Sequence, residues 1–413
     1  MYVRAVPERY RWVVLAAGTF AQASFSTVAV GLPALAPALR AEYGLSLAKT
    51  GLVLGAVGIG MLPTLLPWGL LADRTGERTV IAVGLTGAGA ALGAAAETHS
   101  STNLVAALVL AGALGASVNA ASGRAVMGWF GADERGVALG IRQTAIPIGG
   151  AAAAAALPWL ASAGGTRLAF LALAGTCIAG ATLALLLMRD PPAAPQQRAP
   201  ELVKPVRDPR MWLLGGGSAL FVVAQASLTG FVVLFLHQHR GVSAHAAAAV
   251  LAGVNVLGIG ARIGAGRWSD RLRARIRPMR TIGAALVVGV ALVSLLADAP
   301  LGVLVPALVV AGVLSLSWNG LSFTAAAETA GAARSGAALG FQQTLLAVSS
   351  GVVPPAFAAV VGATSWSVAF AASAAGPLLG LLLLRRVPEP TGVATRPRPG
   401  RTRGTSAIPP AAR

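Results

Sequence analysis

Charged residues are scarce in this chain of 413 residues, where Asp, Glu, Lys and Arg together make up 11% of the sequence. An average soluble domain carries about 25% charged residues. Hydrophobic residues instead make up 55%, and the mean hydropathy is +0.72. This composition excludes a soluble globular protein and predicts a polytopic membrane protein.

Cysteine, histidine and aromatic residues are also few. The single cysteine, Cys177, excludes an intrachain disulfide. With four histidines and no acid well inside an apolar segment, the sequence lacks a catalytic or metal-ligating cluster. We therefore expect no enzyme, cofactor or metal, and keep a membrane-embedded enzyme only as a third alternative. The net charge of +18 is spread between apolar segments and aromatics are 5%, so we expect no nucleic-acid partner.

Long apolar runs are what the sequence does contain. A transmembrane helix needs about 20 apolar residues, and twelve segments meet this: 12–38, 51–71, 79–96, 103–125, 137–161, 168–188, 212–236, 244–267, 280–297, 301–326, 336–361 and 365–385. The sequence thus predicts an all-α membrane protein. We expect one six-helix bundle over 1–188, a Pro-rich cytoplasmic linker over 189–211, a second bundle over 212–386 and a disordered cytoplasmic tail over 387–413.

Lys and Arg are distributed unevenly between the two sides of the membrane. With the N-terminus inside, the outer loops hold four of them: Arg40, Lys49, Arg167 and Arg240. Two more, Arg142 and Arg262, lie within spans, and the rest fall on the inner side. This asymmetry predicts a multi-pass protein of the cytoplasmic membrane with both termini cytoplasmic.

The two halves repeat one another. Residues 111–144 align with 311–344 without a gap, and "GVALGIRQT" at 136–144 recurs as "GAALGFQQT" at 336–344. "AQAS" at 21–24 recurs at 224–227. Parallel repeats of this kind place a site near the membrane midplane between the halves and alternate its access by rocking.

A short polar pattern also occurs in both halves, between spans 2 and 3 and between spans 8 and 9. Its residues are Gly69, Asp73, Arg74, Gly76 and Arg78 in the first copy, and Gly266, Asp270 and Arg271 in the second. We expect Gly69 to allow close approach of two helices and Gly76 to adopt a positive φ. The second copy has Arg273 where the first has Gly76.

This pattern resembles the loop 2–3 signature of the major facilitator superfamily (MFS), and the resemblance covers nearly the whole chain. It implies the MFS fold, twelve helices in two pseudo-symmetric six-helix bundles, and a secondary transporter. It also implies a gating role for the loop acids, with Asp73 facing 335–337 and Asp270 facing 135–137. "RIGAGRWSD", beginning at Arg262, further resembles span 8 of monocarboxylate and oxalate/formate carriers, which implies an organic-anion substrate.

Two missing features bear on the energy source of transport and on the charge of the substrate. The chain has no G-x-x-x-x-G-K-[ST] phosphate loop, so transport is expected to be secondary. All fourteen acidic residues map to loops or span ends. A cation in a dry cavity needs an embedded acid. Its absence favours an organic-anion carrier, and a drug or metabolite efflux antiporter is kept as the alternative.

The embedded charges are two arginines, Arg142 and Arg262. Arginine in a span should face a cavity or a partner, and an anionic substrate is a natural partner. The alternative is snorkelling toward the inner interface. Because Arg142 aligns with Gln342 in the other repeat, the charge breaks the symmetry, and we expect Arg142 to bind an asymmetric ligand.

Polar residues in matching places of the two repeats complete the candidate site. We expect these pairs to be scaffold or cavity lining, and both interpretations stay open: Gln22 with Gln225, Asn119 with Asn319, and Gln143 with Gln343. The expected partners are a small anionic molecule, the lipid bilayer and a coupling proton or exchanged anion, with the protein a monomer.

Overall fold

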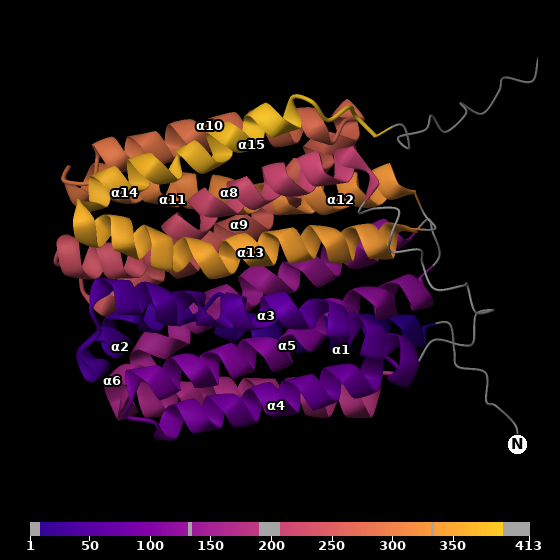
Figure 1. The fold of residues 1–413 in the computed structure, drawn as a ribbon, viewed down its shortest axis with the longest axis horizontal. Coiled ribbons are helices and arrows are strands. Elements are labelled where there is room, and N and C mark those ends of the chain that lie inside the picture. Colours follow the sequence, from indigo (N-terminus) through magenta and orange to yellow (C-terminus); the bar gives the residue numbers. More distant parts are fainter. Residues whose placement is uncertain (1–8, 131–133, 190–206, 332–333, 391–413) are drawn as a thin grey trace, which may run out of the picture.

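The computed structural model describes residues 9–130, 134–189, 207–331 and 334–390, and excludes the side chains of Asp73, Met127, Arg135 and Ser335. These residues form helices throughout and no strand (Figure 1). The first half contains α1 (Tyr10–Ala29), the 3-10 helix η1 (Leu32–Leu35), α2 (Ala36–Tyr43), α3 (Leu47–Thr75), α4 (Glu77–Glu97), α5 (Ser101–Trp129) and α6 (Arg135–Leu187). The second half contains α8 (Pro209–Leu234), the π-helix η2 (Phe235–His239), α9 (Ala244–Leu272), α10 (Ile276–Leu295), α11 (Leu301–Ser317), α12 (Asn319–Ala330), α13 (Ser335–Ala363), α14 (Trp366–Ser373) and α15 (Ala375–Leu384).

Helix α6 crosses the membrane twice. Eleven helical stretches of the described residues are long and apolar enough to span, and the one in α6 runs for 51 residues. Its helical geometry breaks at Gly164 and Gly165, and Gly165 has a φ of 70°. Both ends of α6 lie beside the start of α1, since Glu134 pairs with Arg11 and the Leu187 carbonyl accepts from Tyr10. The described helices therefore make twelve crossings, which confirms the predicted fold class.

Three of the predicted spans are interrupted. The first bends at Gly31, where Pro33 and Pro37 begin η1 and α2. The span predicted over 301–326 divides at Trp318 into α11 and α12, and the last divides at Ala374 into α14 and α15. The first and last breaks have a proline signal, since Pro377 lies four residues after the end of α14. Hydropathy alone shows none of the three, because a break inside an apolar run does not change it.

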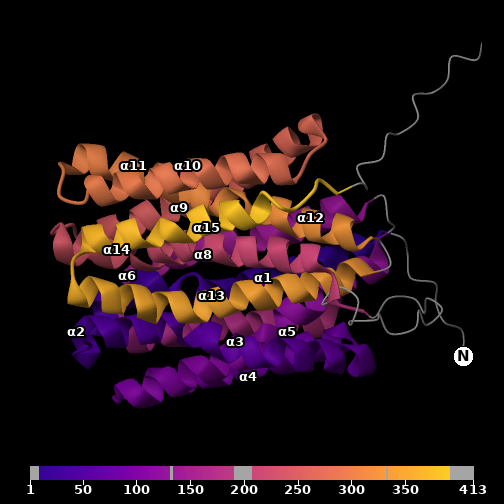
Figure 2. The ribbon, with the colours of Figure 1, turned by 45° about the horizontal axis from the view of Figure 1, so that its top comes forward.

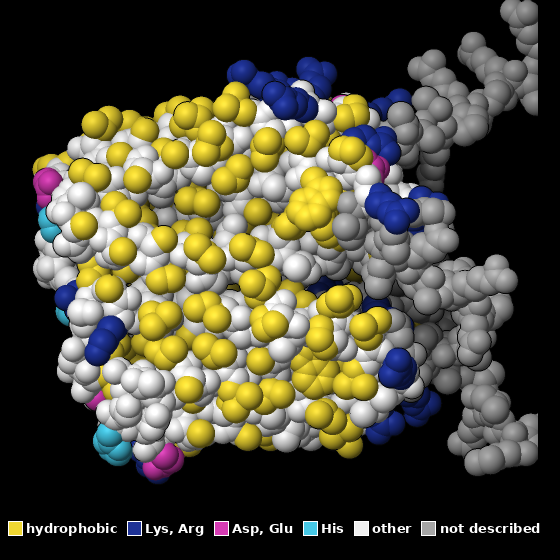
Figure 3. Space-filling view, in the orientation of Figure 1, with side chains coloured by type: hydrophobic (Ala, Val, Ile, Leu, Met, Phe, Trp, Pro, Cys, Tyr) yellow, Lys and Arg dark blue, Asp and Glu magenta, His cyan; other side chains and the backbone are white. Residues whose placement is uncertain are grey.

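The helices of each half pack mainly with one another. Figure 1 shows α1–α6 on one side of the molecule and α8–α15 on the other, and in the turned view of Figure 2 the two groups overlap. The α3–α4 and α9–α10 connections lie at the end where α1 begins, which we call the basic end; α2 and η2 lie at the opposite end. Hydrophobic side chains cover the middle of the surface in Figure 3, and Lys and Arg gather at its ends, most of them at the basic end. This distribution fits a multi-pass membrane protein.

The halves touch closely near the opposite end, through α3 and α13. A Cβ added at Gly55 would lie 2.7 Å from the Gly351 carbonyl oxygen, and one at Gly58 would lie 2.8 Å from the Gly351 nitrogen. Nearer the basic end, Gly69 on α3 and Gly340 on α13 have open space around the Cβ position. The halves are therefore closed at the opposite end and separate toward the basic end along this helix pair.

Candidate functional site

Arg142 is buried in the first half and bonded to neutral partners. It stands on α6 with 9% of its surface exposed. Its Nε donates to Ser122 Oγ on α5 at 2.8 Å, and its Nη2 donates to Gln22 Oε1 on α1 at 3.3 Å. Among the described residues no carboxylate forms an ion pair with it. Because these bonds hold Arg142 among α1, α5 and α6, it does not snorkel to the helix end, and its charge remains uncompensated.

A small cavity lies against this guanidinium. Its volume is about 10 Å³, close to the lower limit for one water-sized group. Its lining includes Arg142, Ser122, Gly18 and Thr19. The Thr19 hydroxyl is buried and has no partner among the described residues. The cavity therefore offers a cation and a hydroxyl to a single atom the size of an oxygen.

The second half repeats this arrangement without the charge. Gln342 on α13 donates from Nε2 to Ser322 Oγ on α12 at 2.5 Å, as Arg142 donates to Ser122. Ser322 also contacts Ser218 on α8 at 2.7 Å. Gln342 is fully buried, and its Oε1 has no partner among the described residues. Glutamine and arginine thus make the same bond to a serine in the two repeats.

The repeated Gln and Asn residues bond to one another within each half. Gln22 Nε2 donates to Asn119 Oδ1 at 3.0 Å, and Asn319 Nδ2 donates to Gln225 Oε1 at 3.1 Å. Each pair joins the first helix of its half to the fourth crossing. Gln22 belongs at the same time to the Arg142 network, so this pair both links helices and orients the arginine.

Arg262 on α9 bonds to two main-chain carbonyls. Its Nε donates to the Leu316 oxygen at 2.8 Å, and its Nη1 donates to the Gln143 oxygen on α6 at 3.1 Å. The second bond crosses from one half to the other and reaches the residue next to Arg142. The structure therefore brings both predicted arginines to one stretch of α6. The side chains of Gln143 and Gln343 are partly buried, and neither forms a hydrogen bond to another described residue.

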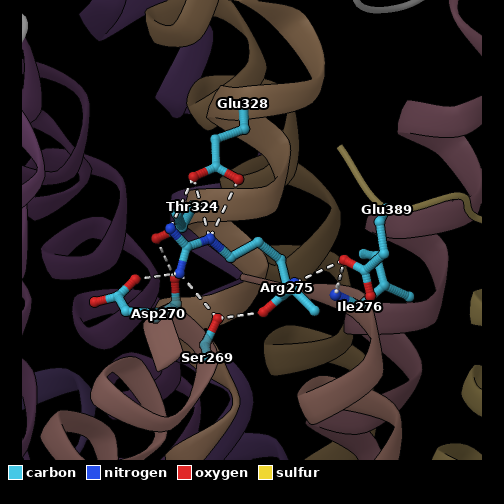
Figure 4. A network of polar contacts seen from close by, with 9 residues as sticks. Ser269, Asp270, Arg275, Ile276, Thr324, Glu328 and Glu389 are labelled. Carbon is cyan, nitrogen blue, oxygen red and sulfur yellow. Dashed lines mark hydrogen bonds and ion pairs between the residues drawn. The ribbon is translucent and has the colours of Figure 1, made fainter. Parts of the chain in front are cut away.

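The basic end holds a second polar cluster, centred on Arg275 (Figure 4). Its guanidinium bonds to Asp270 at 2.5 Å and to Glu328 on α12 at 3.0 Å. Burial alone lowers the pKa of Arg275, but the bonds to Glu328 and Asp270 outweigh it and hold the pKa above its ordinary value. The backbone nitrogens of Arg275, Ile276 and Arg277 donate to the Glu389 carboxylate.

The repeated loop pattern is found in this region, with one difference from expectation. Asp270 accepts from Arg275, the residue that matches Arg78. The side chain of Arg135 lies outside the described residues, so the expected approach of Asp270 to 135–137 stays a prediction. Gly69 has open space instead of a close helix neighbour, and so has Gly266. Gly76 has a φ of 83°, as expected, and Arg273 keeps a φ of 48° without being glycine. Arg74, Arg78 and Arg271 are exposed, while the side chain of Asp73 lies outside the described residues.

The comparison with protein families decides the assignment. The sequence model of the Major Facilitator Superfamily matches residues 14–354. The chain belongs to the major facilitator superfamily. This MFS chain is 33% identical over 391 residues to "Uncharacterized MFS-type transporter Rv2994" of Mycobacterium tuberculosis (strain ATCC 25618 / H37Rv), covering 94% of this chain and 88% of that protein. The family points to a transporter rather than an enzyme.

Solved structures show the same fold. One is a bacterial homolog of the human lysosomal transporter Spinster in an inward-facing, unoccupied conformation, with a TM-score of 0.72, 16% identity and coverage of 94% of this chain and 97% of that one. Another is the nucleoside transporter NupG, with a TM-score of 0.70, 15% identity and coverage of 91% and 99%. At these identities the likeness establishes the MFS fold alone. The monocarboxylate or oxalate/formate subtype expected from the sequence is not among these relatives.

Several residues of this MFS site were not predicted from the sequence. Ser122, Thr19 and Ser322 are hydroxyl residues in apolar spans, where serine and threonine are common packing residues. Glu328 and Glu389 come from distant parts of the chain, and no spacing connects them with Arg275. Ser122 and Ser322 had one signal, since they occupy matching positions of the repeat.

Proposed function

We propose that this MFS protein is a secondary transporter that moves a small carboxylate-type anion across the cytoplasmic membrane by alternating access. The two six-helix bundles, 1–188 and 212–386, are its moving parts, and both termini face the cytoplasm. The observation that carries the proposal is the buried guanidinium of Arg142, which has only neutral partners among the described residues.

The charge of Arg142 is costly where it stands. An arginine at the centre of a span costs about 2.5 to 3.5 kcal/mol on insertion scales. Its hydrogen bonds to the Ser122 and Gln22 oxygens orient the guanidinium, but these acceptors add no negative charge to balance it. A substrate carboxylate would supply that charge and form a charge-assisted bond, which is about twice as strong as a neutral one.

The cavity and the second arginine are consistent with the same substrate class. The space of about 10 Å³ beside Arg142 and Thr19 fits one carboxylate oxygen rather than a whole molecule. Arg262 reaches the neighbouring residue Gln143 and currently bonds only to neutral carbonyls. Two guanidinium groups near one stretch of α6 favour an anion and disfavour a cationic drug.

The test is a panel of labelled carboxylates and lipophilic cations in proteoliposomes, with variants at position 142. Arg142→Gln should stay folded, because Gln342 makes the equivalent bond to Ser322, but its affinity for a transported carboxylate should fall at least about tenfold. Arg142→Lys should recover part of that affinity, since an ammonium cannot grip a carboxylate in two places.

Arg167→Gln is the matched control, because Arg167 is an exposed arginine paired with Glu97 near the opposite end. It should bind and transport as the parent does. Unchanged affinity in Arg142→Gln would remove Arg142 from the site. Transport of lipophilic cations but not carboxylates would replace the proposal with a drug or metabolite efflux antiporter.

A further inference from the structure

Pro147 exposes a backbone carbonyl on α6. Within a helix, each carbonyl accepts from the N–H four residues later, and proline has no N–H to donate. Pro147 lies inside α6, four residues after Gln143. The Gln143 carbonyl therefore lacks its helical partner, and Arg262 of the other half donates to it at 3.1 Å.

The other carbonyl held by Arg262 is also free of regular helical pairing. Leu316 lies next to the end of α11, where Trp318 interrupts the helix. Its oxygen accepts from Arg262 Nε at 2.8 Å and from Asn319 Nδ2 at 3.3 Å. Arg262 is thus fixed by its own half and extends one donor to the other half.

The bond to Gln143 lies between the closed end of the molecule and the basic end. Gln143 is eight residues from the start of α6 and Arg262 is ten from the end of α9, so both lie about 12 to 15 Å from the basic end. Farther along the same helices, a Cβ at Gly150 would lie 2.8 Å from Asn255 Oδ1. The Arg262 bond is placed to limit separation of the halves at the basic end.

We propose that Arg262 is an inter-half latch whose acceptor, the Gln143 carbonyl, is created by Pro147. Breaking the latch lets the halves separate further at the basic end. This inference concerns the conformational equilibrium of the empty protein, so it does not depend on the substrate.

The experiment measures the distance between the halves by spin-label spectroscopy in the full-length protein. Cys177→Ala removes the native thiol, and Thr79→Cys with Thr281→Cys places labels on exposed positions near the basic-end starts of α4 and α10. Arg262→Gln and Pro147→Ala should each raise the ratio of wide to narrow distances by at least about fivefold. The double variant should show no further increase, because both changes remove the same bond.

Pro158→Ala is the matched control, since Pro158 lies in the same helix and no described side chain donates to the Ala154 carbonyl. It should leave the distances unchanged. Three outcomes overturn the latch: unchanged distances in Arg262→Gln, additive shifts in the double variant, or an equal shift in Pro158→Ala. Arg262→Lys, which keeps the charge, should give an intermediate shift and replaces Arg262→Gln if that variant does not fold.

One consequence rests on the proposed function. A carboxylate in the cavity should draw Arg262 away from the neutral Gln143 carbonyl, because charge-assisted bonds are stronger. Adding a transported carboxylate should then raise the fraction of molecules with the wide label distance in the parent protein but not in Pro147→Ala. If no carboxylate changes the distances while Pro147→Ala does, the anionic substrate is refuted and the latch stands.

Discussion

At the scale of single residues, Glu389 shows how one carboxylate organises a helix end. It accepts from the backbone nitrogens of Arg275, Ile276 and Arg277 at 2.7, 2.9 and 2.7 Å. These N–H groups at the start of α10 have no side-chain cap within the helix itself. An anion here also favours the positive end of the helix dipole. Glu389 therefore fastens the end of the second half to α10.

Replacing Glu389 by Ala should lower the free energy of unfolding by about 1 to 2 kcal/mol, because it leaves orphan donors at a helix start. Thermal unfolding of the purified protein in detergent measures the loss. Glu97→Ala is the control, since Glu97 forms an exposed pair with Arg167, and such pairs contribute about 0 to 1 kcal/mol. Equal melting temperatures for the two variants would show that Glu389 does not cap α10.

The sequence could identify the two arginines of the candidate site but not their hydrogen-bond partners. Arg142 could be found because it differs between the two copies of the repeat while most of its neighbours are identical. Arg262 could be found because it is a charged residue in an apolar run. The acceptors of Arg262 are backbone carbonyls, which every residue possesses. Pro147 could be recognised as a helix-kinking residue. Only the packing of α6 on α9 shows that Arg262 donates to the carbonyl that Pro147 leaves without a helical partner.

At the scale of helices, the contact between α3 and α13 depends on glycine. A Cβ at Gly55 would lie 2.7 Å from the Gly351 oxygen and 3.0 Å from Pro355 Cδ, while one at Gly51 would lie 2.5 Å from the Ala358 Cβ. Backbones can approach this closely only where side chains are absent. The smallest added side chain should therefore oppose closure at the opposite end.

Gly55→Ala should shift the protein toward a state open at the opposite end, by at least about fivefold in population, since overpacking costs about 1 to 3 kcal/mol. Spin labels at Thr102→Cys and Gly302→Cys, exposed matching positions at that end, report the separation. Gly93→Ala is the control, because a Cβ there meets nothing within 4 Å. An unchanged distance in Gly55→Ala would mean that α3 and α13 do not set the closed state.

Helix positions followed from hydropathy, whereas helix interruptions did not. Long apolar runs predict spans because each must cover the hydrocarbon core. The break at Trp318 lies inside such a run, and Trp318 is fully buried against Phe221. The turn-favouring pair Asn319–Gly320 follows directly, so local sequence and tertiary packing meet at this break. The break in turn frees the carbonyl to which Arg262 donates.

At the scale of the whole molecule, the twofold repeat and the charge asymmetry act together. Each repeat supplies a Gln–Asn pair and a serine that accepts a bond from the matching position of α6 or α13. Only the first repeat places a charge there. A symmetric scaffold with one asymmetric cation can bind an asymmetric ligand in one orientation while both halves move in the same way.

The orientation in the membrane is the final prediction. Exposed arginines gather at the basic end, among them Arg74, Arg78, Arg271 and Arg277. Basic residues near a span end are retained on the cytoplasmic side and are attracted to its anionic lipids by about 1 kcal/mol each. A membrane-impermeant maleimide added to intact cells should therefore label Thr102→Cys and Gly302→Cys but not Thr79→Cys or Thr281→Cys. Permeabilised cells should label all four, and the reverse pattern in intact cells would place the basic end outside.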